Sequence, residues 1–173
     1  MTHTIDMIDF ILTAAAVWIV FCVIRYMLLK KNGSTDMKKL LHLTTAYFYF
    51  VILISIMLLP VVLSAPYRGM FSPSFIMTIS ASEFSGSAFI YKLGDLLLFI
   101  PLPVCLYICG VKRMSEVRYA LAAGIIFSLG IEILQLAEGL AGIAYRYTGL
   151  TDVLLGTAGA LAGWNMIRTH RKR

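Results

Sequence analysis

The chain of 173 residues is 60% apolar, with a mean hydropathy of +0.84. Soluble globular domains are about 45–50% apolar, so this composition excludes that class and predicts one membrane domain over residues 1–173. The formal net charge of +6 would suit nucleic acid. However, the basic residues gather at the ends of apolar runs, which is the pattern of membrane topology, so we expect no nucleic-acid partner.

Five apolar runs are long enough, or nearly so, for a transmembrane helix, which needs about 20 residues. They are Ile8–Leu29, Leu40–Leu63, Leu93–Gly110, Val117–Ala137 and Leu150–Ile167. The sequence therefore predicts an all-α, polytopic helix bundle with about five transmembrane helices in a lipid bilayer. Residues 1–63 would form the two N-terminal helices. Asp6 and Asp9, with no Lys or Arg before them, argue against a cleaved signal peptide.

The basic residues divide unevenly between the two sides of such a bundle. One side would carry Arg25, Lys30, Lys31, Lys38, Lys39, Lys112, Arg113, Arg118, Arg168, Arg171, Lys172 and Arg173, and the other only Arg68, Lys92 and Arg146. Basic loops stay in the cytoplasm. We therefore expect the N-terminus outside and the C-terminus in the cytoplasm.

The segment 64–92 is the longest predicted outer segment. It alternates turn residues such as Pro66, Gly69 and Pro73 with aromatic and aliphatic residues such as Phe71 and Phe75. Such a segment is too apolar to lie free in water. We expect it to lie in the membrane interface or to fold back over the helices, either as an anchor or as a lid over a ligand.

The third helix is predicted to start near Gly94-Asp95 and contains Pro101 and Pro103. A proline has no N–H, so each one leaves a carbonyl in the preceding turn without its usual partner and bends the helix. In lipid such a carbonyl needs another partner, so this helix should face the bundle interior. Asp95 would be either a helix N-cap at the outer boundary or a functional charge.

The fourth helix carries three polar residues with helical spacing. Ser128, Glu132 and Gln135 follow at i, i+4 and i+7, which places them on one face. A charge at mid-membrane costs about 2.5–3.5 kcal/mol on insertion scales, so Glu132 is expected to have a purpose.

The fifth helix combines a carboxylate with a series of glycines. Asp152 lies at its start, as an N-cap or as a functional charge. Gly156, Gly159 and Gly163 follow, and the last two form a G-x-x-x-G motif, which predicts close helix packing.

A count of residues along the helices predicts that the charged residues lie at a similar depth in the membrane. With a rise of about 1.5 Å per residue from the basic boundaries, Asp95, Glu132 and Asp152 all fall in the outer third of the hydrocarbon layer. Arg146, in the short outer loop between the last two helices, is the expected counter-charge and should pair with Glu132. The sequence thus predicts a polar cluster near the outer face.

These residues resemble the VanZ-like family of bacterial membrane proteins, named after an accessory protein of teicoplanin resistance. Residues 70–165 carry the resemblance. Its elements are Phe99-Ile100-Pro101, then Ser128, Glu132 and Gln135, then Arg146, Asp152, Thr157 and Gly159, with a weaker outer-loop match at Phe71–Phe75. The chain departs from the family pattern at three positions, where Asp95 and Gly156 replace asparagines and Pro103 replaces a glycine. These changes make the site more acidic than the pattern.

The resemblance implies a multi-pass protein of the bacterial cytoplasmic membrane that acts at the outer face. Its partner there would be a lipoglycopeptide or a lipid-linked cell-wall precursor. Three functions stay open: a binding or shielding protein, an enzyme on a lipid head group with Glu132 as general base, and a structural protein whose polar cluster locks the helices. In the enzyme, Arg146 would hold an anionic head group.

Metal or cofactor chemistry has little support in the sequence. The cysteines Cys22, Cys105 and Cys109 lie in apolar runs, and the histidines His3, His42 and His170 fall on or near other surfaces. Two cysteines one helical turn apart make a poor metal site by themselves. We expect no metal and no cofactor, and no nucleophile–histidine pair marks a hydrolase.

The predicted topology can be tested with single cysteines in a cysteine-free background. Ser85→Cys should react with a membrane-impermeant maleimide in intact cells, whereas Ser115→Cys should react only after the membrane is opened. The opposite labelling would place the polar cluster at the cytoplasmic face.

Overall fold

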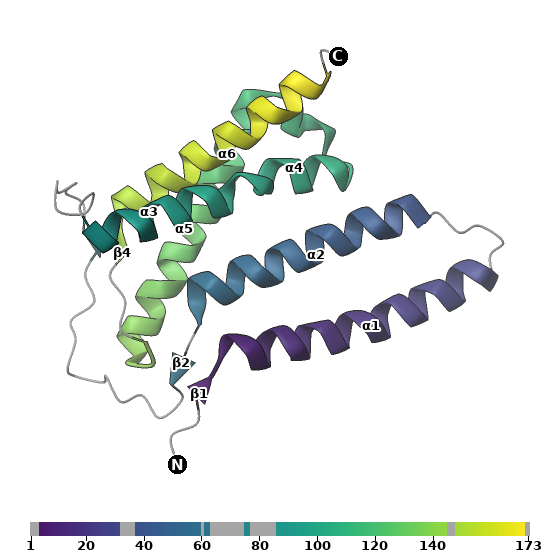
Figure 1. The fold of residues 1–173 in the computed structure, drawn as a ribbon, viewed down its shortest axis with the longest axis horizontal. Coiled ribbons are helices and arrows are strands. Elements are labelled where there is room, and N and C mark those ends of the chain that lie inside the picture. The colour runs from purple at the N-terminus through teal and green to yellow at the C-terminus, as the bar shows by residue number, and fades with distance from the viewer. Residues whose placement is uncertain are drawn as a thin grey trace.

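The structure is a computed structural model that describes residues 4–31, 37–59, 61–62, 75–76, 86–144 and 148–171. Its helices are α1 (Met7–Lys31), α2 (Met37–Leu58), α3 (Gly86–Phe99), α4 (Pro101–Ile108), α5 (Val117–Ala141) and α6 (Leu150–Arg171), with a 3₁₀ turn at Lys112–Ser115. The strands β1 (Thr4–Ile5), β2 (Val61–Val62), β3 (Phe75–Ile76) and β4 (Thr148–Gly149) have two residues each. The described part of the chain is therefore a bundle of helices (Figure 1).

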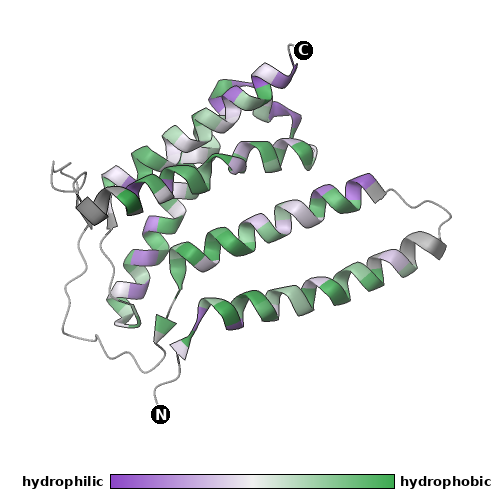
Figure 2. Ribbon diagram, in the orientation of Figure 1, coloured by the Kyte–Doolittle hydropathy of each residue, from purple (hydrophilic) through white to green (hydrophobic). Residues whose placement is uncertain are grey.

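Three helices are long and apolar enough to cross a membrane. These stretches are Met7–Ile24 in α1, Lys38–Leu58 in α2 and Val117–Ala141 in α5. Figure 2 shows α1 and α2 as largely hydrophobic ribbons. Most of the large apolar side chains of α1 are exposed, as expected of a helix that faces lipid. The prediction of an all-helical fold is confirmed, and the three apolar helices fit a membrane protein, while the count of five transmembrane helices stays a prediction.

The third predicted helix is two consecutive helices, α3 and α4, that meet at Ile100. The Ile100 N–H donates to the Leu97 carbonyl (3.3 Å), and the Tyr49 hydroxyl of α2 donates to the Leu98 carbonyl (2.8 Å). The break follows from Pro101, which cannot continue the hydrogen-bond ladder. Phe99 is 2% exposed, so the break faces the bundle interior, where protein groups satisfy these two carbonyls.

The starts of two helices decide the roles of two carboxylates. α3 begins at Gly86, earlier than the sequence predicted, so residues 86–92 are not part of an outer loop and Asp95 is not an N-cap. α6 begins at Leu150, where its apolar run begins, and this start places Asp152 within the first turn and not at the cap. Tertiary contacts can override local sequence signals, and α3 is in contact with α6. The remainder of the predicted outer segment, apart from Phe75 and Ile76, lies outside the described residues.

Small residues on α6 allow α3, α4 and α5 to approach it closely. A Cβ added to Gly159 would lie 2.2 Å from the Leu96 carbonyl oxygen, and one added to Gly163 would lie 2.0 Å from that of Ile100. On α5, a Cβ at Gly124 would lie 2.8 Å from the Cβ of Ala160. Backbone-to-backbone contact of this kind is the basis of small-residue packing in membranes. α6 is therefore the axis around which α3, α4 and α5 gather.

The two ends of the bundle differ in chemistry. At one end β1 pairs antiparallel with β2 and β3 pairs parallel with β4, near the start of α3 and the end of α5 (Figure 1). The other end carries the 3₁₀ turn and the C-terminal part of α6, which the Trp164 Nε1–H links by donating to the Ser115 carbonyl (2.9 Å). Exposed Lys112, Arg113, Arg118, Arg168 and Arg171 lie at this end. This grouping agrees with the basic side predicted from the sequence.

The glycine contacts predict opposite effects of two alanine substitutions. Gly163→Ala should lower the free energy of unfolding by about 1–3 kcal/mol, because its methyl group would overlap the Ile100 backbone. Gly130→Ala on α5 is the control: an added Cβ there meets nothing within 4 Å, and alanine stabilises a helix interior by up to about 1 kcal/mol over glycine. Denaturation of the two variants in detergent provides the comparison. Equal stabilities would show that α4 does not pack on Gly163.

Candidate functional site

A polar cavity of about 190 Å³ lies among α2, α3, α5 and α6. Its lining residues are Met57, Lys92, Asp95, Phe99, Ser128, Ile131, Glu132, Gln135 and Asp152. The charged and polar members come from α3, α5 and α6, and the apolar members Met57, Phe99 and Ile131 complete the wall. The cavity therefore collects residues that are far apart in the sequence.

The polar face of α5 forms one wall of the cavity. Ser128, Glu132 and Gln135 are 3%, 4% and 9% exposed. The Gly149 N–H of β4 donates to Glu132 Oε2 (2.9 Å), and Gln135 Nε2 donates to the Met57 carbonyl of α2 (2.7 Å). These hydrogen bonds satisfy polar groups that would be costly to bury alone. They also tie α5 to the start of α6 and to the end of α2.

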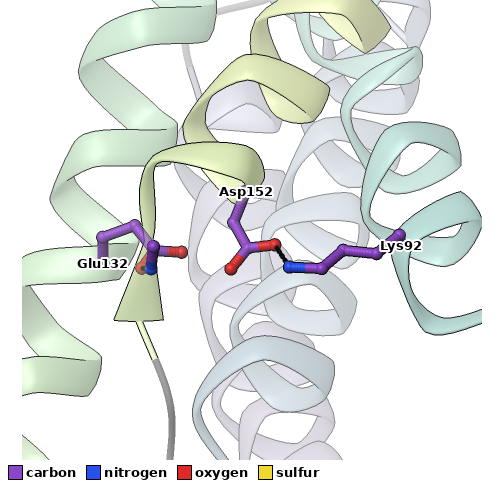
Figure 3. Close-up of polar contacts among 4 residues, drawn as sticks. Lys92, Glu132 and Asp152 are labelled. Carbon is purple, nitrogen blue, oxygen red and sulfur yellow. Dashed lines mark hydrogen bonds and ion pairs between the residues drawn. The ribbon is translucent and has the colours of Figure 1, made fainter. Parts of the chain in front are cut away.

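A salt bridge joins α3 to α6 at the cavity. Lys92 Nζ contacts Asp152 Oδ1, and the two side chains are 19% and 20% exposed. Figure 3 shows the ammonium group directed at Asp152, with Glu132 on the far side of that carboxylate. Lys92, Asp95 and Phe99 line the same cavity because they follow at i, i+3 and i+7 along α3. The salt bridge thus lies in the more exposed part of the site, and the Glu132 side chain is more deeply buried.

Ser128 contributes a hydroxyl group without a protein partner in the described part of the chain. Its Oγ is buried and makes no hydrogen bond to those residues. A Cβ added to Gly156 would lie 2.0 Å from this oxygen, so the glycine of α6 leaves the space that the hydroxyl occupies. Native structures satisfy nearly all buried polar groups. A buried hydroxyl in a cavity wall is therefore available to a bound polar group.

The structure brings together most of the residues that the sequence selected. Asp95, Ser128, Glu132, Gln135 and Asp152 all line the cavity. Thr157 is not among the described lining residues: its Oγ1 donates to the Val153 carbonyl of its own helix (2.7 Å), and its Cα packs near Gly124. Arg146, the expected partner of Glu132, lies outside the described residues. That these residues bind a ligand stays a prediction.

Lys92 is the site residue that the sequence did not identify. It was counted only as one of the few basic residues of an outer loop. One signal was available, namely its position three residues before Asp95, which places both on one face if the helix begins before residue 92. The predicted start of this helix, near Gly94, lies after Lys92, so the spacing between Lys92 and Asp95 falls outside the predicted helix.

The lining limits the chemistry that the cavity supports. Among the lining residues that the structure describes, three carboxylates, those of Asp95, Glu132 and Asp152, face one ammonium group, that of Lys92. Within the described ranges, no three His, Cys, Asp or Glu side chains are placed to hold a metal ion. The described lining also contains neither cysteine nor histidine. The site therefore suits a ligand with a cationic or hydrogen-bond-donating group.

Comparison with known proteins gives one match. The family model described as VanZ/LLP1 matches residues 10–171. The match therefore includes α1 and α2, beyond the residues 70–165 that carried the resemblance in the sequence. No curated protein and no solved structure matches the chain.

The salt bridge predicts energetic coupling between α3 and α6. Lys92→Gln and Asp152→Asn should each lower stability in detergent, because each leaves one charge poorly compensated. The double variant should lose less than the sum, with a coupling energy of about 0.5–3 kcal/mol. Lys112→Gln, an exposed lysine at the other end, combined with Asp152→Asn, is the control pair and should be additive. Additive losses for Lys92 and Asp152 would contradict the salt bridge.

Proposed function

The chain belongs to the VanZ/LLP1 family, and from this premise we propose that it is a binding protein of the bacterial cytoplasmic membrane that lowers the access of lipoglycopeptides such as teicoplanin to their target. The observation that carries the proposal is the polar cavity, whose described lining combines three carboxylates, one lysine and a serine hydroxyl that has no partner among the described residues. Ligand sites are typically concave and place a few polar groups in a largely apolar wall.

The charge of the lining favours a ligand with an ammonium group. Charges in a poorly solvated site need compensation, and among the described lining residues three carboxyl groups, those of Asp95, Glu132 and Asp152, face the ammonium group of Lys92. An ammonium group brings a compact positive charge with three hydrogen-bond donors. Carboxylate oxygens and the Ser128 hydroxyl are acceptors for these donors. A cationic ligand would therefore be bound more tightly than an anionic one of the same size.

The shape of the site favours one head group rather than a whole ligand. A volume of about 190 Å³ is below the range of about 300–1,000 Å³ that accommodates drug-sized molecules. Lys92 and Asp152 are partly exposed, whereas Glu132 is 4% exposed. An ammonium group would pass the salt bridge before it reached Glu132. The bulk of a lipid-tailed ligand would stay in the adjoining bilayer.

The orientation in this proposal places the cavity at the outer face. Its support is the grouping of basic residues at the opposite end of the bundle, since basic segments stay in the cytoplasm. α3 with α4, and α6, would then complete five spans. A lipid-tailed glycopeptide reaches the bilayer surface at this face, where the cavity can hold it away from lipid-linked precursor.

An enzyme on a lipid head group is the second candidate. The observation that favours it is the placement of Glu132, one of whose carboxylate oxygens is fixed by the Gly149 N–H within the cavity. A general base needs a defined position within reach of the proton that it removes. Altered membrane lipid composition on expression, lost with Glu132→Gln, would distinguish this function from binding.

A structural role is the third candidate, since the bonds of Glu132 and Gln135 connect α5 to other elements. A purely structural role predicts that Glu132→Gln acts only by lowering the amount of folded protein. Membrane levels of each variant therefore have to be measured alongside any effect on drug tolerance.

Expression in a susceptible Gram-positive host provides the direct test. Tolerance to teicoplanin should rise several-fold and more than tolerance to vancomycin, because only the lipid-tailed drug works partly at the bilayer surface. Glu132→Gln and Asp152→Asn should remove the effect at normal membrane levels of the protein. Glu116→Gln, an exposed carboxylate at the basic end, is the control and should keep it. Unchanged teicoplanin tolerance at verified expression would refute the proposed function.

A further inference from the structure

A second hollow, of about 370 Å³, lies between α4 and α6 and shares no lining residue with the polar cavity. It is lined by Val104, Tyr107, Ile108, Met166, Ile167, His170 and Arg171. We propose that this groove binds one anionic phospholipid. An acyl chain would lie along the apolar wall, and the phosphate group would contact Arg171.

The groove follows from the way α4 and α6 pack. The two helices are in close contact at Gly163, where an added Cβ would lie 2.0 Å from the Ile100 carbonyl oxygen and 2.8 Å from Pro103 Cγ. Beyond this point α6 carries Met166 and Ile167 in place of glycine, and both line the groove. α4 then ends at Ile108, and the chain turns at Gly110 with a φ of 103°. The space between the helices therefore begins one turn past the glycine contact.

The lining has the two parts that a phospholipid requires. Val104, Ile108, Met166 and Ile167 offer an apolar wall, while His170 and Arg171 lie at the terminal turn of α6. Guanidinium groups bind phosphate oxygens through two parallel hydrogen bonds. Basic pockets between transmembrane helices are typical binding sites for anionic lipid head groups.

The surroundings favour an anionic over a zwitterionic lipid. Lys112, Arg113 and Arg168 are exposed at the same end of the bundle. The acidic residue described there, Glu116, forms a salt bridge with Arg118 (2.7 Å) and so does not offset the other basic residues. Arg168 stacks on Trp164, with 5.4 Å from its Cζ to the ring centroid. An amphipathic aromatic ring of this kind suits the head-group level of a membrane.

Competition between two lipids tests the proposal on the purified full-length protein. The chain is reconstituted in equimolar phosphatidylglycerol and phosphatidylcholine, extracted in mild detergent, and analysed by native mass spectrometry for retained lipid. We expect a several-fold preference for phosphatidylglycerol. Arg171→Gln should lose most of this preference, whereas Arg118→Gln, which removes an exposed arginine outside the groove, should retain it.

A groove-filling variant tests the acyl-chain wall separately. Val104→Trp should lower the retention of both lipids, provided that circular dichroism shows native helix content. Because Arg171 is exposed, Arg171→Gln is expected to leave the fold intact and gives an answer even if Val104→Trp does not fold. Glu132→Gln should leave lipid retention unchanged, which separates this groove from the polar cavity.

Three results would overturn the proposal. They are equal retention of the two lipids by the wild type, equal effects of Arg171→Gln and Arg118→Gln, and crosslinking of two copies through Ile108→Cys in native membranes. The last result would assign the groove to a second copy of the chain. None of them depends on teicoplanin tolerance, so the proposed function stands or falls independently.

Discussion

The contact between Lys92 and Asp152 is the interaction on which the site depends. It joins α3 to α6 within a region where charges are poorly solvated, and it does so beside the carboxylates of Asp95 and Glu132. An unpaired charge in such a place would be several kcal/mol less favourable. α3 approaches α6 closely at Gly159, where a side chain would meet the Leu96 backbone, one helical turn from Lys92. The glycines of α6 therefore permit the close helix packing beside which the salt bridge forms.

The two ends of the bundle differ in the charge of the residues that line their sites. One end holds a small polar cavity whose described lining has more carboxylates than cations, and the proposed ligand is a positively charged head group. The other end is basic and holds a larger apolar groove, for which the proposed ligand has a negative head group. Opposite charges at the two ends of one helix bundle would give each end a different class of ligand. The same glycine-rich face of α6 contributes to both, through Gly156 beside the cavity and Gly163 beside the groove.

Sequence periodicity predicted the parts of the structure that depend on one helix. The spacing of Ser128, Glu132 and Gln135 placed them on one face of α5, and this face lines the cavity. The spacing of Gly159 and Gly163 indicated close packing, and the two glycines meet the backbones of Leu96 and Ile100. Both inferences need only the 3.6-residue repeat of a helix and the size of a side chain.

The features that the sequence did not predict depend on contacts between helices. Nothing in residues 86–92 marks the start of α3 as clearly as Pro101 marks its end, and the contact of α3 with α6 cannot be read from the sequence of one helix. With a predicted helix start at Gly94, Asp95 is a possible cap and Lys92 lies in the preceding loop. Asp152 was ambiguous for a similar reason, since only the position of Lys92 distinguishes a cap from a salt bridge. Arg146 carries the positive charge expected of a partner for Glu132, but it lies outside the described residues.

The proposed binding function requires a cavity that is open to the outer face and selects cations. Ile131→Cys, in a cysteine-free background, places a thiol in the cavity wall beside Glu132. Its reaction in intact cells with two impermeant methanethiosulfonates, one carrying trimethylammonium and one carrying sulfonate, measures both properties at once. After normalisation to a free thiol, we expect much faster reaction with the cationic reagent, and a loss of that preference with Glu132→Gln. Equal rates for the two reagents, or no reaction with either, would contradict it.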